Sequence, residues 1–167
     1  MPCGRERIQM EEKITDYQLI IKQLEALADI SGETIPIMSN VSALLFEELD
    51  EVNWAGFYIV KGDELLLGPF QGKVACVKIE KGKGVCGSAW AKDKIQRVDD
   101  VHSFPGHISC DSASKSEIVI PIHKNGEVFA VLDIDSPKPA NFSRADQDGL
   151  SLIARKLEEI LENQNEL

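Results

Sequence analysis

The sequence lacks any apolar run long enough to cross a bilayer, and its first nine residues are polar, without the hydrophobic core of a secretion signal. We therefore expect a cytoplasmic protein with no membrane partner. Basic residues are also scarce, because 18 Lys and Arg stand against 28 Asp and Glu and give a formal net charge of −10. Nucleic-acid binders concentrate Lys and Arg, so this deficit argues against a nucleic-acid partner.

Cysteine is scarce too, with four in 167 residues. A chain of this length that is 43% apolar can bury the core of one domain without cross-links. In a reducing compartment we expect its cysteines to be reactive, metal-bound or buried rather than structural disulfides. Cys3 lies in a polar N-terminal leader, residues 1–14, and supports no hypothesis.

Hydrophobic periodicity predicts one α+β domain over residues 15–164, with helices packed mainly on one side of an antiparallel sheet. Three helices are expected, over residues 16–28, 36–49 behind Thr34 as N-cap, and 143–162 behind a capping box of Ser143 and Asp146. Strands are expected in a first hairpin (53–60 and 65–70), at 73–79, and in a last hairpin (117–123 and 127–135).

The segment from Ala91 to Ser116 is polar and has no convincing period, which predicts a long loop on the other side of the sheet. Loops of this length in small domains are usually functional. The segment holds two of the three histidines. The third, His123, is interpreted as a plain neighbour in the last hairpin.

The last hairpin predicts a cluster of carboxylates. A three-residue loop at 124–126 would pair His123 with Glu127 and so place Glu117 opposite Asp133, with Asp135 on the same face. Crowded acids on a half-buried face hold a proton near neutrality or bind a cation such as a substrate ammonium. A two-residue loop would send Glu117 to the opposite face. A solvated polar face is the alternative, and for Asp135 alone it is the favoured one.

Three cysteines are candidates for chemistry. Cys110 lies in the polar loop segment GHISCDSAS, where a low-pKa thiolate is plausible, whereas Cys86 follows a glycine-rich turn before a small helix and fits a buried hydrophobe. A zinc site is a competing interpretation, because Cys110 and His107 have ligand-like spacing. No CxxC pair supports it, and its remaining ligands would come from Cys76, Cys86 and His102.

Trp54 and Tyr58 lie four residues apart on one expected strand, and so on one face of it. Core packing is the usual role of such rings. The functional alternative is an aromatic wall that holds a thioether or sulfoxide methyl group.

Seven motifs together resemble the free-methionine-(R)-sulfoxide reductases, which are GAF-domain enzymes acting on the free amino acid. They are NWAGFY, GPFQGK, ACVKI, GKGVCGSA, DDVHSFPGHISCDS, SEIVIPI and VLDIDSP, and the likeness covers roughly residues 16–160 in order. Departures are slight: Val74 stands where the family commonly has Pro, and Ser109 where it commonly has Ala.

The resemblance implies a role for each matching position. Cys110 corresponds to the catalytic cysteine, Cys76 to the resolving cysteine and Cys86 to an auxiliary third. Substrate binding is implied for the residues that match the family's aromatic wall, its carboxylates and the backbone N–H groups before the catalytic cysteine: Trp54, Tyr58, Ile108, Ser109, Glu117, Asp133 and Asp135.

The implied reaction reduces free methionine-(R)-sulfoxide, leaves a sulfenic acid on Cys110, and closes a disulfide with Cys76 that thioredoxin reduces. It needs no metal and no bound cofactor. A GAF-type sensor that binds a small molecule without turnover is the alternative from another class. The sequence leaves the oligomeric state open, with a homodimer as one option.

Overall fold

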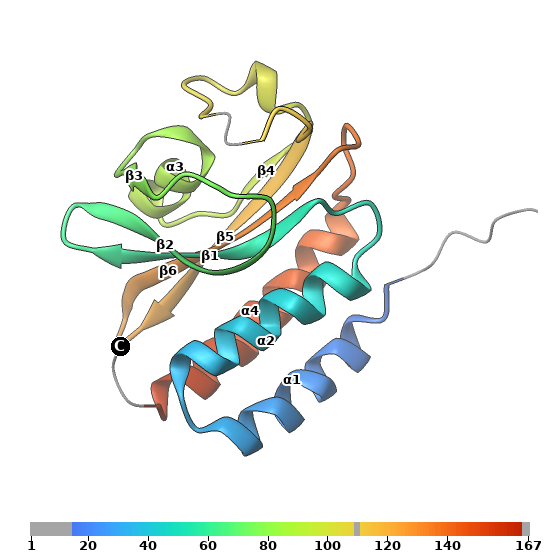
Figure 1. The fold of residues 1–167 in the computed structure, drawn as a ribbon, viewed down its shortest axis with the longest axis vertical. Helices are drawn as coiled ribbons and strands as arrows, with labels where there is room; N and C mark the ends of the chain where they lie inside the picture. Colours follow the sequence, from blue (N-terminus) through green and yellow to red (C-terminus); the bar gives the residue numbers. More distant parts are fainter. Residues whose placement is uncertain (1–14, 109–110, 165–167) are drawn as a thin grey trace, which may run out of the picture.

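The computed structural model describes residues 15–108 and 111–164 (Figure 1). The expected leader at 1–14 and the candidate site residues Ser109 and Cys110 lie outside the described residues. Within the described ranges, no helix has the length and apolar character needed to span a bilayer.

A curled antiparallel sheet forms the centre of the domain, and its described strands run in the order β3-β2-β1-β6-β5-β4. The two central neighbours are β1 and β6, which come from the first and last hairpins. The strand bounds are β1 Trp54–Lys61, β2 Glu64–Gly72, β3 Lys78–Glu80, β4 Gln96–Val98, β5 Ser116–Lys124 and β6 Glu127–Ser136.

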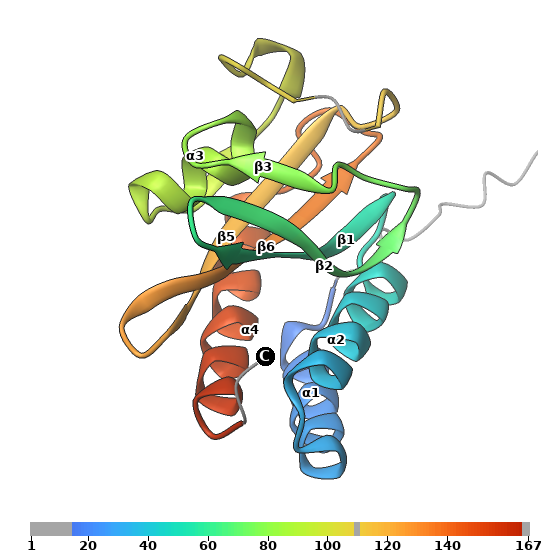
Figure 2. The same ribbon diagram turned by 60° about the vertical axis from the view of Figure 1, so that its left-hand side comes forward.

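Three helices cover one face of this sheet, as Figure 2 shows: α1 Tyr17–Ser31, α2 Thr34–Glu48 and α4 Arg144–Glu162. The main core lies between them and the sheet, where Phe57, Ile118 and Leu132 meet Leu24, Leu45 and other buried helix residues. The other face carries α3 Gly84–Lys92 and the segment that follows it, including the short 3-10 helix η1 Val101–Ser103. The expected α+β arrangement is confirmed.

Two of the four described α-helices begin at a residue whose side chain caps the helix. Asp16 accepts a hydrogen bond from the Leu19 N–H at 3.0 Å, and Ser143 forms the expected capping box with Asp146. The prediction for Thr34 was wrong. Thr34 is buried and is itself the first residue of α2, with Glu33 in extended geometry before it.

The prediction from the sequence made one strand too long and missed another. Residues 73–77 do not form the expected strand, and β3 begins only at Lys78. The expected loop from Ala91 to Ser116 contains β4, which pairs with the edge of β5, and η1. A three-residue edge strand is too short to show a period, so its identity comes from its partner.

The last hairpin has a two-residue turn at Asn125 and Gly126, both with positive φ, rather than the expected three-residue loop. Glu117 therefore pairs with Asp135, and the prediction that it pairs with Asp133 was wrong. A bulge between Ile122 and His123 adds one residue to β6 and restores the parity. Glu117 and Asp135 consequently share one face, and Asp133, two residues away on β6, shares it as well.

Candidate active site

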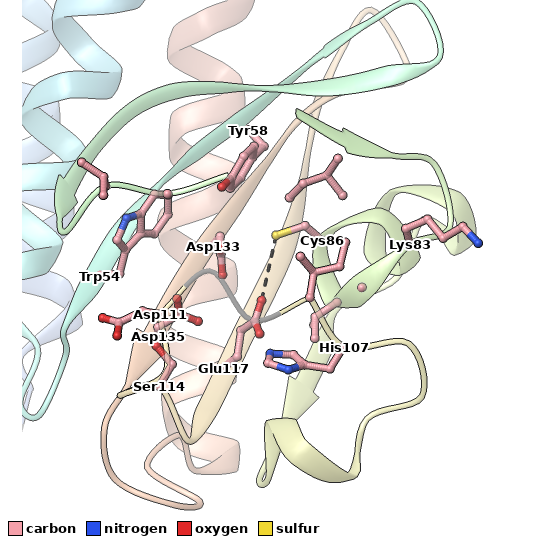
Figure 3. A pocket seen from close by; sticks show the side chains of 16 residues that line it. Trp54, Tyr58, Lys83, Cys86, His107, Asp111, Ser114, Glu117, Asp133 and Asp135 are labelled. Carbon is pink, nitrogen blue, oxygen red and sulfur yellow. Dashed lines mark hydrogen bonds between the residues drawn. The ribbon is translucent and has the colours of Figure 1, made fainter. Parts of the chain in front are cut away.

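The face of the sheet opposite the three helices carries a cavity, into which the three predicted acids project (Figure 3). Its empty volume, with the solvent-filled mouth included, is about 540 Å³. Glu117 of β5 is 7% exposed and Asp133 of β6 is 6% exposed, while Asp135 is half-buried. The predicted clustering of the acids is therefore present, although the register that produces it differs.

Burial dominates the electrostatics of these acids. Together with the charges of Asp133 and Asp135, it raises the pKa of Glu117 well above its usual range. Burial raises the pKa of Asp133 to about 6, and burial with the Asp133 charge raises that of Asp135. Because the acids cannot all be ionised together, the site keeps at least one protonated carboxyl at neutral pH, and Glu117 is the best candidate for it.

Asp133 also has an oxygen, Oδ1, that is buried without a hydrogen-bond partner among the described residues. A buried polar atom of this kind costs about 1–3 kcal/mol unless it is satisfied. A cationic or hydrogen-bonding ligand in the cavity would satisfy it. The described part of the chain thus supplies a proton donor and an unsatisfied acceptor in one pocket.

Cys86 lies beside the acids, near the N-terminal end of α3. Its Sγ is 3.9 Å from Glu117 Oε1 (Figure 3), and burial with the charges of Asp133 and Glu117 raises the thiol pKa. Cys86 is a free cysteine and is held as a thiol rather than as a thiolate. The ligand atoms of Cys86, Glu117 and Asp133 lie within 4.8 Å of one another, so this set could hold a small cation.

Trp54 and Tyr58 form one wall of the cavity and are also buried in an apolar cluster on this face of the sheet. Their ring centroids are 5.9 Å apart, and the Trp54 ring also stacks on Phe70 at 5.2 Å. Gly56 makes this possible, because a Cβ at Gly56 would lie 2.3 Å from the Cβ of Phe70. The wall is therefore built from β1 and β2, which approach each other closely at Gly56.

The polar ends of both rings anchor the segment 73–76. Trp54 Nε1–H donates to the Lys73 carbonyl at 3.1 Å, and the Tyr58 hydroxyl donates to the Cys76 carbonyl at 3.0 Å. Burial raises the Tyr58 pKa, so its hydroxyl remains a donor. Cys76 is half-buried and disulfide-bonded, and its partner is not among the described residues. Cys110, the predicted nucleophile, lies outside the described residues.

The ligands of the competing zinc site do not come together in the described part of the chain. Cys76 is in a disulfide, His102 is exposed, and the one metal-competent group found among the described residues contains neither of them. His107 and Ile108 do line the cavity, and Ile108 is 39% exposed at its edge.

Comparison with known proteins identifies the family. Residues 38–162 match the GAF domain. The chain is 50% identical over 134 residues to the free methionine-R-sulfoxide reductase of Escherichia coli. The matched region covers 79% of this chain and 81% of that protein. The chain belongs to the free methionine-R-sulfoxide reductase family of GAF domains.

Two solved structures of free methionine-R-sulfoxide reductases superpose closely on this family member. The Staphylococcus aureus protein in its reduced form gives a TM-score of 0.87 at 47% identity and covers 92% of this chain and 99% of its own. The Neisseria meningitidis protein in complex with its substrate gives a TM-score of 0.86 at 38% identity, and the match covers 94% of this chain and 95% of that protein. The fold is therefore that of the reductase family over nearly the whole described chain.

Sequence reasoning missed three polar residues at this reductase site. Asn53, the residue before β1, donates from Nδ2 to Asp111 Oδ2 and to Ser114 Oγ, both at 3.2 Å. Asp111 and Ser114 line the cavity next to Asp135 (Figure 3). The sequence carried one signal for them, since an Asp two residues before an Ala or Ser favours a side-chain turn, and Asp111 Oδ1 accepts from the Ala113 N–H at 2.9 Å.

Proposed function

We propose that this protein reduces free L-methionine-(R)-sulfoxide to L-methionine in the cytoplasm, using thiols as the source of electrons. The observation that carries the proposal is the buried carboxyl group of Glu117, whose pKa burial raises, beside an aromatic wall in one small cavity. A sulfoxide oxygen needs a proton as it leaves, and its methyl group needs an apolar contact. The E. coli and yeast relatives that carry this activity in their names are 50% and 41% identical to the chain.

In the proposed reaction the Cys110 thiolate attacks the sulfoxide sulfur and Glu117 protonates the oxygen. The oxygen is transferred to the Cys110 sulfur, which becomes a sulfenic acid, and methionine leaves. The Cys76 thiol then condenses with the sulfenic acid, releasing water and forming a disulfide. The disulfide-bonded state of Cys76 supports its resolving role, while Cys86 remains a free thiol and an auxiliary. A dithiol such as thioredoxin reduces the disulfide.

Both ends of the amino acid have complementary groups in this proposal. The substrate ammonium meets Asp133 and Asp135, whose raised pKa values a cation would lower again. The substrate carboxylate meets backbone N–H groups at residues 108–110, which include Ser109. The methyl group lies against Trp54 and Tyr58.

The test is a turnover assay with separated R and S epimers of free methionine sulfoxide, on wild type, Cys110→Ser and Cys76→Ser. We expect the R epimer to turn over with dithiothreitol, and Cys110→Ser to abolish it. Cys76→Ser should keep more dithiothreitol-driven than thioredoxin-driven activity, because a small thiol can reduce the sulfenic acid directly. Full activity of Cys110→Ser would refute the nucleophile. Binding of the R epimer without turnover by the wild type would favour the ligand sensor.

A further inference from the structure

Apolar side chains are exposed on both sides of Cys76. Val74 and Val77 are 88% and 69% exposed, more than any other large hydrophobic residue in the described part of the chain, and Ile108 is 39% exposed. Val74 and Ile108 line the same cavity, although they are far apart in sequence. Single exposed apolar residues are ordinary, but two that flank the disulfide-bonded Cys76 and a third that lines the same cavity indicate a contact surface.

This surface is held in place by its backbone. The carbonyls of Lys73 and Cys76 accept from Trp54 and Tyr58, and the Val77 carbonyl accepts from the Leu67 N–H at 3.0 Å. The segment 73–77 is therefore fixed at three points, and its valines face solvent without being loose. A preordered surface loses little entropy when a partner binds.

The surrounding charge is opposite in sign to that of the molecule. Residues 73–83 contain four Lys and one Glu, whereas the whole chain has a formal net charge of −10. Lys78 pairs with Glu64 at 2.8 Å, and Lys81 lies over the Trp90 ring at 4.7 Å. Lys73 and Lys83 are exposed, and Lys83 lines the cavity with Val74. A partner that fits has an apolar contact patch with acidic residues near it.

We propose that residues 73–83, together with Ile108, form the docking surface for the protein dithiol that regenerates the enzyme. The inference rests on the proposed function, which needs such a reductant. One thiolate of the partner attacks the Cys76 sulfur to form a mixed disulfide, and Cys110 leaves as a thiolate. The second thiol of the partner then attacks the mixed disulfide, so Cys76 is released reduced and the partner departs as a disulfide.

The experiment compares two reductants on Val77→Asp and Lys73→Glu, neither of which alters a cavity residue. Leu19→Asp is the matched control, because Leu19 is 48% exposed on α1, across the sheet from the cavity. For each variant, kcat/KM for thioredoxin in a coupled assay is measured beside the dithiothreitol-driven rate at saturating R epimer. We expect the thioredoxin value to fall about tenfold or more in both variants, as loss of an interface anchor does, with dithiothreitol rates unchanged.

The salt dependence provides a second readout. For the wild type, kcat/KM for thioredoxin should fall as ionic strength rises. In Lys73→Glu this dependence on ionic strength should be weaker. Equal kcat/KM values for thioredoxin in Val77→Asp and Leu19→Asp would overturn the docking surface. So would a homodimer that Val77→Asp dissociates with thioredoxin turnover unchanged, because the surface would then belong to a second copy. Failure of the proposed function is distinct, since the wild type would then not turn over with dithiothreitol.

Discussion

Glu117 is the residue at which chemistry and stability conflict. Its carboxyl is almost fully buried beside two other acids, and burial raises its folded-state pKa well above the ordinary value of 4.5. The folded protein therefore binds more protons than the unfolded chain between those two pKa values. Stability should fall as the pH rises through that window, because the sign of the dependence follows the excess of bound protons.

We accordingly predict that Glu117→Gln lowers turnover by about 10²-fold or more, as loss of a general acid does, while raising the melting temperature above pH 7. The two effects are measured by the R-epimer assay and by thermal denaturation at pH 5 and pH 8. Glu127→Gln on the same hairpin is the control, since Glu127 is exposed. A lower melting temperature at pH 8 for Glu117→Gln would mean that the carboxyl is held by contacts that outweigh its burial.

The same scale shows where sequence reasoning succeeds and where it stops. Trp54 could be placed on one face with Tyr58, and Asp133 on one face with Asp135, because alternation along a single strand is local information. Asn53 could not, because its partners, Asp111 and Ser114, are 58 and 61 residues away. Its role depends on a contact between the start of β1 and the segment before β5, and no local pattern encodes such a contact.

Among the elements, α3, β5 and α4 meet at His123, which the sequence suggested was a plain hairpin neighbour. Its Nδ1 lies 2.8 Å from Glu158 of α4 and its Nε2 lies 2.7 Å from Asp93, the C-cap of α3. Burial alone would lower the His123 pKa, but the hydrogen bonds to Glu158 and Asp93 outweigh it and raise the pKa. The imidazole thus ties the helix that carries Cys86 to the last helix.

A His whose pKa is raised on folding stabilises the folded protein, and the full effect is present below the unfolded-state pKa of about 6.5. This stabilisation is lost as the pH rises through the folded-state pKa. We predict that the wild type has a larger free energy of unfolding than His123→Gln. This difference should be larger at pH 5.5 than at pH 9. Urea denaturation at the two pH values measures the difference. His102→Gln is the control, because His102 is exposed. A gap that does not change with pH would show that the imidazole acts as a neutral hydrogen-bonding group.

The hairpin of β5 and β6 shows why register is harder to predict than the elements themselves. The period of 117–123 and 127–135 predicted two strands correctly, yet the turn and the bulge each changed the pairing by one residue. Only the sum of the two errors kept the acids together. Bulges respond to twist and packing from both faces, which a strand pattern does not record.

The two faces of the sheet differ in their tasks, since three helices and the main core lie on one side, and α3, a smaller apolar cluster and the cavity lie on the other. The proposed substrate then has both charged ends enclosed, and buried charges require partners. We predict that N-acetyl-methionine-(R)-sulfoxide amide is a poorer substrate than the free amino acid, by at least about 10³-fold in kcat/KM, because unmatched buried polar groups discriminate strongly. Steady-state kinetics on both compounds measure this ratio. Comparable values would mean that the cavity is open at one end.

The central pairing of β1 with β6 also sets the order in which the protein can assemble. Trp54 to Ile59 pair with Ala130 to Asp135, so the middle of the sheet joins segments more than 70 residues apart. A ribosome must therefore synthesise β6 before β1 can pair on that side, and long-range pairing of this kind folds slowly. The acids of β6 arrive last, and until then Cys86 has neither Asp133 nor its burial to keep it a thiol. The nascent chain should accordingly be the form of this protein in which Cys86 is most open to oxidation.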